Sequence, residues 1–425
     1  MNLNDAKQTL EKYLGNLYGL DEKTLDYQKR RYEKLTGLFE NIFKTQPINY
    51  FSSPGRTEIS GNHTDHNHGK VITASINLDS IACGIKSVDV VEIYSEGYEK
   101  PFVVNLKNLN LVNSETGTTN ALIRGIASQF VQKGFNVGGF KACIASDVLI
   151  GSGLSSSASI EILIGTIFNK FYNDGKVASE EIAIIGQYAE NKYFGKPCGL
   201  MDQIACITGG IVEIDFYNPG KPIIKKIDFD FQATGYKLVA VDTEANHANL
   251  TEDYAAIPDE MKSVAKYFNK EYCSEITLEE LFDQIKLLRE AVGDRAILRA
   301  IHFLEENKRV EKQICALKKD NFEEFLILVN ESGNSSYKYL QNIYTPQNVN
   351  EQSVALALAI SDIFIREKGK GACRVHGGGF AGTIQVFLPE ELIEGYKSYI
   401  SKIFKADSVK VLSIRHYGAV CLTNF

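Results

Sequence analysis

Val148-Leu149-Ile150-Gly151-Ser152-Gly153-Leu154-Ser155-Ser156-Ser157-Ala158-Ser159 is the segment from which the fold can be predicted. An apolar run stops at Ile150, and two glycines and five serines follow within nine residues. Apolar residues then recur at three- and four-residue spacing, at Ile160, Leu163, Ile164, Ile167, Phe168 and Phe171. This spacing is typical of a helix with one buried face. The segment therefore predicts a strand, a tight loop and a helix.

The loop has the chemistry of an anion site. Glycines let backbone N–H groups approach a ligand closely, and the helix N-terminus adds unpaired N–H groups and a partial positive charge. Serine hydroxyls can bond a phosphate or face a magnesium ion. No lysine follows the second glycine, so the loop is not a P-loop, and Ser156 replaces the third glycine of GxGxxG. From these residues alone, a serine-capped helix after a glycine turn is the alternative.

The same loop resembles the second motif of the GHMP kinases, a family named for galacto-, homoserine, mevalonate and phosphomevalonate kinases. That motif reads Pro-x-Gly-x-Gly-Leu-Ser-Ser-Ser-Ala, and here Leu149 takes the place of the proline. The resemblance implies that the loop holds the phosphates of ATP with Gly151, Ser152, Gly153, Leu154, Ser155, Ser156 and Ser157.

The composition is that of an ordinary soluble globular protein of one or two domains, with 425 residues, 44% hydrophobic and 23% charged. A net charge of -7 gives no basic surface for nucleic acid. The N-terminus has no apolar signal region, and no run of about 18 apolar residues predicts a membrane span. The eight cysteines are scattered, which favours a reduced, cytoplasmic protein without disulfides. We expect neither nucleic acid nor membrane as a partner.

A second polar segment extends from Pro54 to Lys70. Its density of hydrogen-bonding groups and scarcity of apolar residues indicate a solvated loop or a binding site. His63, His66 and His68 with Asp65 could ligate a metal, although the HExxH helix pattern is absent. Alternatively, several short donors and acceptors on one loop suit the paired hydroxyls of a sugar.

This segment resembles the galactokinase signature Gly-Arg-x-Asn-x-Ile-Gly-Glu-His-Thr-Asp-Tyr-Asn-Gly-Gly. The matching residues are Arg56, Gly61, His63, Thr64, Asp65, Asn67 and Gly69. Five positions differ: Glu58 replaces Asn, Ser60 replaces Ile, Asn62 replaces Glu, His66 replaces Tyr and His68 replaces Gly. The resemblance implies that Asn62, His63 and Asp65 contact the sugar.

Residues 190–203 resemble the galactokinase segment Ala-Glu-His…Pro-Cys-Gly-Ile-Met-Asp-Gln. By this resemblance Asp202 is the catalytic aspartate, Glu190 ligates magnesium together with Ser157, and Gly199 contacts the sugar. An aspartate after an apolar pair can also be a helix cap, which is the alternative interpretation of Asp202.

Two later segments add to the resemblance. Asn246–Tyr254 is similar to the family's His-x-x-x-x-x-Glu-Tyr segment, which implies that Tyr254 lies near the sugar. Gly377-Gly378-Gly379-Phe380-Ala381-Gly382 resembles the third GHMP motif, with Ala381 in place of a glycine. The resemblance implies that Gly378 and Gly379 help to bind ATP, whereas the residues alone predict a hairpin turn.

Periodicity predicts helices over 1–45, 119–134, 179–194 and most of 278–345, and short strands between 71 and 105. The resemblance implies an α+β, two-lobed GHMP kinase fold with the site between the lobes. The N-terminal lobe would contain a left-handed βαβ unit like domain 2 of ribosomal protein S5, and the C-terminal lobe would be ferredoxin-like with added helices. We predict a monomer with a helical N-terminal extension over 1–37, an ATP- and sugar-binding lobe over 38–220 and a C-terminal lobe over 221–425.

The activity implied by the resemblance is transfer of the γ-phosphoryl group of ATP, with Mg²⁺, to the C1 hydroxyl of galactose. Asp202 would accept or orient the hydroxyl proton, and Arg56 would keep Asp202 ionised and stabilise charge on the transferred group.

Three alternatives stay open. In the family a glutamate at position 62 bonds the sugar's C6 hydroxyl, and Asn62 removes its negative charge. A kinase for galacturonate, N-acetylgalactosamine or arabinose is therefore one alternative. A non-catalytic sensor of galactose and ATP is another. The metal interpretation of the histidine cluster is the third.

Overall fold

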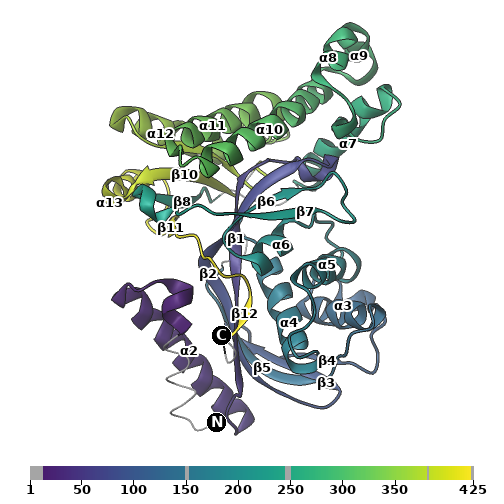
Figure 1. The fold of residues 1–425 in the computed structure, drawn as a ribbon, viewed down its shortest axis with the longest axis vertical. Helices are drawn as coiled ribbons and strands as arrows, with labels where there is room; N and C mark the ends of the chain where they lie inside the picture. The colour runs from purple at the N-terminus through teal and green to yellow at the C-terminus, as the bar shows by residue number, and fades with distance from the viewer. Residues whose placement is uncertain (1–12, 149–152, 245–249, 381, 423–425) are drawn as a thin grey trace. The chain divides into compact units, whose positions relative to one another are not determined.

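The computed structural model describes residues 13–148, 153–244, 250–380 and 382–422 (Figure 1). A short helical segment covers 13–18. The helices and strands that follow are α2 (Glu22–Phe43), β1 (Asn49–Ser60), β2 (Lys70–Lys86), β3 (Val90–Ser95), β4 (Phe102–Asn105), α3 (Thr119–Gln132), β5 (Phe140–Ser146), α4 (Ser156–Tyr172), α5 (Ser179–Ala189), α6 (Met201–Thr208), β6 (Ile211–Asp215), β7 (Ile223–Ile227), β8 (Tyr236–Asp242), α7 (Thr251–Tyr267), α8 (Leu278–Asp283), α9 (Ile285–Val292), α10 (Asp294–Lys318), α11 (Phe322–Ser335), α12 (Ser353–Lys368), β9 (Ala372–His376), β10 (Thr383–Pro389), α13 (Ile393–Ile400), β11 (Val409–Leu412) and β12 (Val420–Cys421).

The chain divides into two compact units, and both are discontinuous in sequence. Unit 1 comprises Met1–Arg56, Ala74–Gly210 and Ile414–Phe425, and unit 2 comprises Thr57–Thr73 and Ile211–Ser413. These ranges differ from the predicted division at 37/38 and 220/221. The first predicted boundary falls inside α2, and the end of the chain belongs to unit 1.

The sheet of unit 1 has the strand order β12-β1-β2-β5-β3-β4. Because side chains alternate between the faces of a strand, β2 and β5 bury residues on both sides. Ile81 and Cys83 of β2 pack with Leu35 and Phe39 of α2. Phe140 of β5 packs against Phe168 of α4, with ring centroids 5.2 Å apart. The sheet therefore has α2 on one face and the helices that include α4 on the other, as Figure 1 shows.

The predicted strand and helix on either side of Gly153 are present, with one shift. The strand β5 ends at Ser146, so Val148 follows it as part of the connection. Residues 149–152, which include Gly151 and Ser152, lie outside the described residues. The helix α4 begins at Ser156 and buries Ile164, Ile167 and Phe168, as their spacing predicts.

The N-terminal helices are part of the core of unit 1, not a separate extension. Asp79 of β2 is fully buried and accepts hydrogen bonds from Arg31 of α2 (2.7 Å), Arg415 (3.0 Å), Ser52 and Tyr18. One carboxylate thus joins α2, β1, β2 and the C-terminal segment within this unit. Such a buried charge is tolerated because its oxygens are paired with guanidinium groups.

Unit 2 contains a sheet with the antiparallel order β11-β8-β10-β9. Val239 of β8 and Val386 of β10 share a core with Phe364 of α12 and Tyr396 of α13. A second core is built by α7, α9 and α10 around Ile257, Leu288 and Phe303. The strands β6 and β7 form an antiparallel pair, and β6 also pairs with β2.

The polar end of β1 corrects one expectation from the sequence. We expected a solvated loop or a binding site over 54–70, and the solvated-loop alternative is wrong for Thr57, Glu58 and Ser60, which lie on a buried strand. Their polar groups are paired inside unit 2: Gln385 donates to Thr57 (2.7 Å), Arg374 donates to Glu58 (3.1 Å), and Ser60 donates to Glu306 (3.2 Å). Polarity alone was misleading here, because buried strands can carry polar residues whose partners are supplied by distant segments.

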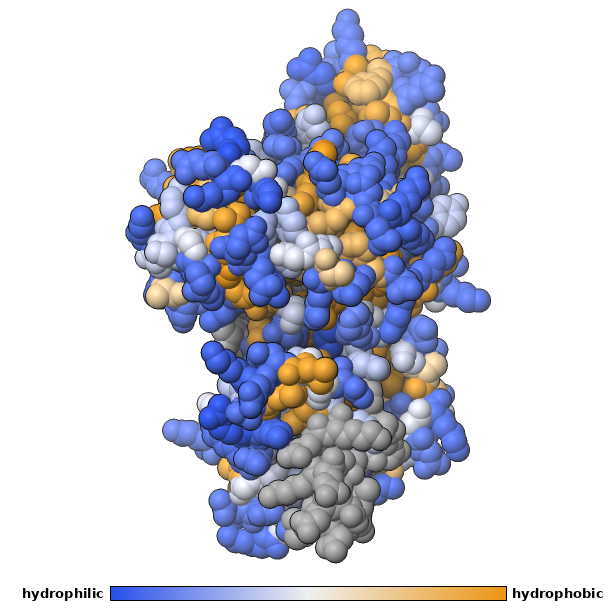
Figure 2. Space-filling model, turned by 60° about the vertical axis from the view of Figure 1, so that its left-hand side comes forward, coloured by the Kyte–Doolittle hydropathy of each residue, from blue (hydrophilic) through white to orange (hydrophobic). Residues whose placement is uncertain are grey.

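The surface face in Figure 2 carries polar and charged side chains over most of its area, with smaller apolar areas between them. Among the helices that the structure describes, none has both the length and the apolar composition needed to cross a membrane.

The buried Asp79 cluster generates a prediction about stability. Replacing Asp79 by Asn should lower the free energy of unfolding by about 3–5 kcal/mol, because the buried Arg415 then loses its ion-pair partner and Arg31 keeps only its pair with Asp147. The matched control is Lys34→Ala, which removes an exposed ion pair with Glu96 and should cost less than about 1 kcal/mol. Urea unfolding followed by circular dichroism measures both, and equal losses in the two variants would contradict the assigned role of Asp79.

Candidate active site

The backbone of the serine loop is held against the end of β1 in unit 1. The N–H of Arg56 donates to the carbonyl of Leu154 (3.1 Å), and Arg56 Nη1 donates to the carbonyl of Gly153 (2.6 Å). A Cβ at Gly55 would lie 2.8 Å from the Leu154 carbonyl oxygen, so only glycine allows this approach. The sequence of β1 therefore fixes the positions of Gly153 and Leu154.

Ser155 occupies the N-cap position of α4 in an unusual conformation. Its φ is +58°, in the left-handed region that costs roughly 1–2 kcal/mol for a residue with a Cβ. Its side chain makes no capping hydrogen bond and donates to Asp202 Oδ2. A serine with a strained backbone, whose hydroxyl bonds a carboxylate and does not cap its helix, is typical of a functional site.

Asp202 lies in the first turn of α6 and is held by three donors. Arg56 makes a bidentate interaction with it, in which Nε donates to Oδ1 (2.7 Å) and Nη2 donates to Oδ2 (2.9 Å). Ser155 Oγ is the third donor. Burial raises the pKa of Asp202, but the charge of Arg56 and these hydrogen bonds outweigh burial and bring the pKa below its usual value. The side chain keeps 26% of its surface exposed. The N-cap of α6 is Leu200, so the helix-cap alternative does not account for Asp202.

Ser157 and Glu190 lie together and offer oxygen ligands. Ser157 Oγ donates to Glu190 Oε1 (3.0 Å), and Lys196 Nζ lies 3.1 Å from the same oxygen. Two protein oxygens fit Mg²⁺, which is usually bound by one or two protein groups together with phosphates and water. No group of three or more His, Cys, Asp or Glu side chains suited to a metal occurs among the described residues, so this pair would depend on phosphate oxygens to complete the shell.

The Glu190 carboxylate is fixed from behind by Gln203. Gln203 Nε2 donates to Glu190 Oε2 (3.1 Å) and to Glu161 Oε2 (2.8 Å). Burial, and then the charge of Glu190, raise the pKa of Glu161 well above its usual value. Glu190 therefore faces Ser157 and Lys196 through Oε1.

In unit 2 the galactokinase-like segment and the triple glycine form one hydrogen-bonded group. The glycines connect β9 to β10 as a hairpin, as the residues alone predicted. Every carbonyl of the triple glycine accepts from a side chain: Gly377 from Asn62 (2.6 Å), Gly378 from His63 (2.9 Å) and Asn342 (3.1 Å), and Gly379 from the Tyr254 hydroxyl (2.9 Å). Burial, and then the neighbouring His66, lower the pKa of His63 to about 4, so its ring is neutral and donates from Nε2.

Comparison with known proteins finds matches over both segments that carry these residues, the one with Ser155 and Asp202 and the one with Asn62 and His63. Residues 121–210 match the family described as GHMP kinases N terminal domain, and residues 37–86 match the galactokinase galactose-binding signature. A galactokinase of Clostridium tetani is 30% identical over 369 residues, which are 85% of this chain and 90% of the relative. The chain belongs to the galactokinase family.

Solved structures show the same fold. The crystal structure of Lactococcus lactis galactokinase complexed with galactose has a TM-score of 0.78 at 23% identity, covering 92% of this chain and 99% of that one. Methanococcus jannaschii mevalonate kinase has a TM-score of 0.61 at 20% identity, covering 87% and 99%. The predicted GHMP kinase fold is therefore confirmed.

The histidines of the galactokinase segment do not converge on one point. His63 bonds Gly378, His66 lies 3.6 Å from the Asp65 carboxylate, and His68 stacks on Tyr272 with ring centroids 3.6 Å apart. The described contacts therefore give no support to the metal interpretation of this cluster.

The remaining predicted residues stay predictions. Asp65 accepts from the N–H of His66 (2.9 Å). Gly199 is half-buried in the irregular segment before α6, and Ser156 is the first residue of α4. Asn62 is fully buried and its amide is engaged within unit 2.

Sequence reasoning missed several residues that support the galactokinase-family site. Lys196 and Gln203 contact Glu190, and Glu161 lies behind them. Glu161 comes four residues after Ser157 on a helix, so the two face the same side, and this spacing was an available signal. Arg374 and Asn342 carried no signal, because only the folded chain brings them to the galactokinase segment.

The glycine turn gives a matched pair of variants. A Cβ at Gly379 would lie 2.0 Å from the Asn342 carbonyl oxygen, whereas a Cβ at Gly377 would meet nothing within 4 Å. Both residues have positive φ, +79° and +66°. Gly377→Ala should therefore cost about 1–2 kcal/mol of unfolding free energy, and Gly379→Ala should cost a further 1–3 kcal/mol, roughly the range for overpacking. Denaturant unfolding decides this, and equal losses would show that the turn is not held as described.

Proposed function

We propose that this protein is an ATP-dependent kinase that phosphorylates the C1 hydroxyl of galactose. The observation that carries the proposal is the Asp202 carboxylate, partly exposed and held ionised by Arg56 and Ser155. Membership of the galactokinase family and the match to the galactose-binding signature support the sugar.

Asp202 orients the attacking hydroxyl and accepts its proton. A carboxylate with a lowered pKa is a weak base, so it takes the proton only as the hydroxyl oxygen bonds phosphorus and becomes acidic. This suits phosphoryl transfer, whose loose transition state requires alignment and charge stabilisation more than a strong base. Arg56, already fixed by Gly153, supplies positive charge next to the reacting oxygen.

The phosphates of ATP are bound by the serine loop, Gly151–Ser157, with Gly378 and Gly379 assisting. The first N–H groups of α4, which begins at Ser156, have no partner within the helix, and such groups are suited to bind an anion. Ser157 and Glu190 would hold Mg²⁺, which supplies neutralising charge for the phosphates when it is bound.

Four residues are proposed to contact the sugar: His63, Asp65, Gly199 and Tyr254. His63 and Tyr254 are each fixed by a glycine carbonyl, which orients their rings before any ligand binds. Preorganised side chains of this kind lower the entropy cost of binding.

A coupled ATP-consumption assay with magnesium tests the function against galactose, galacturonate, N-acetylgalactosamine, glucose and arabinose. We expect turnover with galactose and a sugar 1-phosphate product in phosphorus NMR. Asp202→Asn should lower kcat by roughly 10²- to 10⁴-fold while sugar binding is retained. The matched control, Asp174→Asn, removes an exposed carboxylate and should leave kcat unchanged.

Each other outcome has a definite meaning. Turnover with galacturonate, N-acetylgalactosamine or arabinose but not with galactose would replace the proposed substrate. Galactose binding without turnover of any sugar would favour a galactose and ATP sensor. Full activity of Asp202→Asn would overturn the role of Asp202.

A further inference from the structure

The side chain of Asn62 has no hydrogen-bonding group left for a ligand. It is fully buried, and its Nδ2 donates to Glu58 Oε1 (3.0 Å) and to the Gly377 carbonyl (2.6 Å). Its Oδ1 accepts from Asn342 Nδ2 (2.7 Å) and, at a longer distance, from Ser336 Oγ (3.4 Å). A carboxamide has two N–H donors and one oxygen, and all are engaged here.

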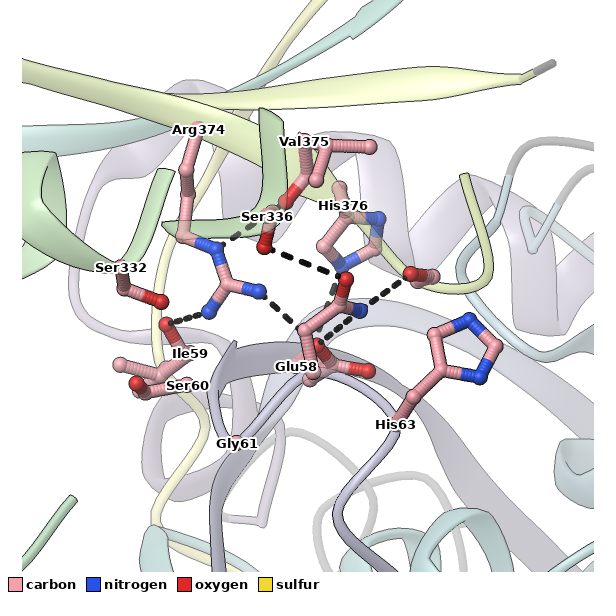
Figure 3. A network of polar contacts seen from close by, with 12 residues as sticks. Glu58, Ile59, Ser60, Gly61, His63, Ser332, Ser336, Arg374, Val375 and His376 are labelled. Atoms are coloured by element: carbon pink, nitrogen blue, oxygen red, sulfur yellow. Dashed lines mark hydrogen bonds and ion pairs between the residues drawn. The ribbon is translucent and has the colours of Figure 1, made fainter. Parts of the chain in front are cut away.

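Glu58, the first partner of Asn62, is a buried carboxylate with its own countercharge. Only 4% of its surface is exposed, and Arg374 Nη2 donates to the same Oε1 at 3.1 Å. Arg374 is in turn fixed by the carbonyls of Ile59 (2.8 Å) and Val375 (3.1 Å), as Figure 3 shows. A carboxylate at position 58 is therefore built into unit 2.

The sequence difference at these two positions is an exchange. The galactokinase signature has asparagine where this chain has Glu58 and glutamate where it has Asn62. Because the two side chains are in direct contact at 3.0 Å, the chain retains one carboxylate and one carboxamide in contact with their places reversed. Either change alone would leave two carboxylates beside Arg374 or deprive the buried Arg374 of its ion-pair partner, and both situations are unfavourable.

We propose that Glu58 and Asn62 are a compensating exchanged pair, and that Asn62 is a positioning residue for the turn at Gly377–Gly379 and not a contact to the sugar. This inference rests on the proposed sugar-kinase function. Asn62 fixes the first carbonyl of the turn, next to the carbonyls fixed by His63 and Tyr254. The absence of glutamate at position 62 consequently does not convert the protein into a uronic-acid kinase, because residue 62 does not select the sugar.

The test is a double-mutant cycle of Asn62→Glu, Glu58→Asn and the double exchange. Asn62→Glu should lower kcat/KM about 10- to 100-fold for every accepted sugar alike, because it removes two donors and places a second carboxylate beside Glu58. The ratio of kcat/KM for galactose to that for galacturonate should not change. The double exchange should recover activity to within about threefold of the parent protein, the coupling expected of residues in contact.

Stability and sugar binding give readouts that do not depend on activity. Both single variants should melt at lower temperature than the parent, and the double exchange should recover most of the loss. Asn350→Glu, the same substitution at an exposed site of unit 2, is the matched control and should change neither property. Titration calorimetry with galactose should show weaker binding for Asn62→Glu and recovery in the double variant.

Two results would overturn the inference. If Asn62→Glu alone binds galactose more tightly or changes the sugar ratio, residue 62 faces the sugar. If the double exchange is no more stable than the worse single variant, the pair does not compensate. Absence of turnover with any sugar in the parent protein would instead count against the proposed function, and the melting temperatures of the cycle would still decide the pairing.

Discussion

The bidentate ion pair between Arg56 and Asp202 is the interaction on which the candidate site in unit 1 depends. Arg56 bonds both oxygens of Asp202 and also the carbonyl of Gly153, so the same side chain fixes a helix residue and the serine loop. A planar fork matches a carboxylate in this way, and lysine could not replace it. Ser155 accepts a left-handed backbone conformation to add a third donor. The local strain is consistent with a site in which alignment matters more than helix stability.

Unit 2 uses a different arrangement, in which a buried carboxylate supports the polar end of β1. Glu306, fully buried, accepts from Ser60, Gly61 and Ser332. Burial raises the pKa of Glu306, but interactions with the neighbouring His302, Arg309 and Arg374 outweigh burial and lower it to about 2. The polar strand end at Ser60 is thus stabilised by paired charge and not by apolar packing. That support explains how a segment with almost no apolar residues can lie inside a folded unit.

The sequence predicted the parts of the molecule that depend on local patterns. Helical spacing from Ile160 to Phe171 located α4, and the galactokinase-like segments brought Arg56 and Asp202 together in advance of the structure. The buried strand at Thr57–Ser60 was not predictable from polarity, because its partners Gln385, Arg374 and Glu306 come from more than 240 positions away. The discontinuous division into two units could not be predicted for the same reason. Arg415 contacts Asp79 only in the folded chain. Asn62 could be recognised as a departure from the signature, but the compensation by Glu58 required a measured contact.

The central claim, that Arg56 and Ser155 hold Asp202 ionised, is tested most directly by the pKa of Asp202 itself. Carbon-13 NMR of carboxyl-labelled protein, with Asp202→Asn used to assign the signal, measures that pKa in solution. We predict a value below about 3.9, the ordinary value for aspartate, and an increase in Arg56→Gln. An Asp202 that titrates at or above the ordinary value, with no response to Arg56→Gln, would contradict the claim.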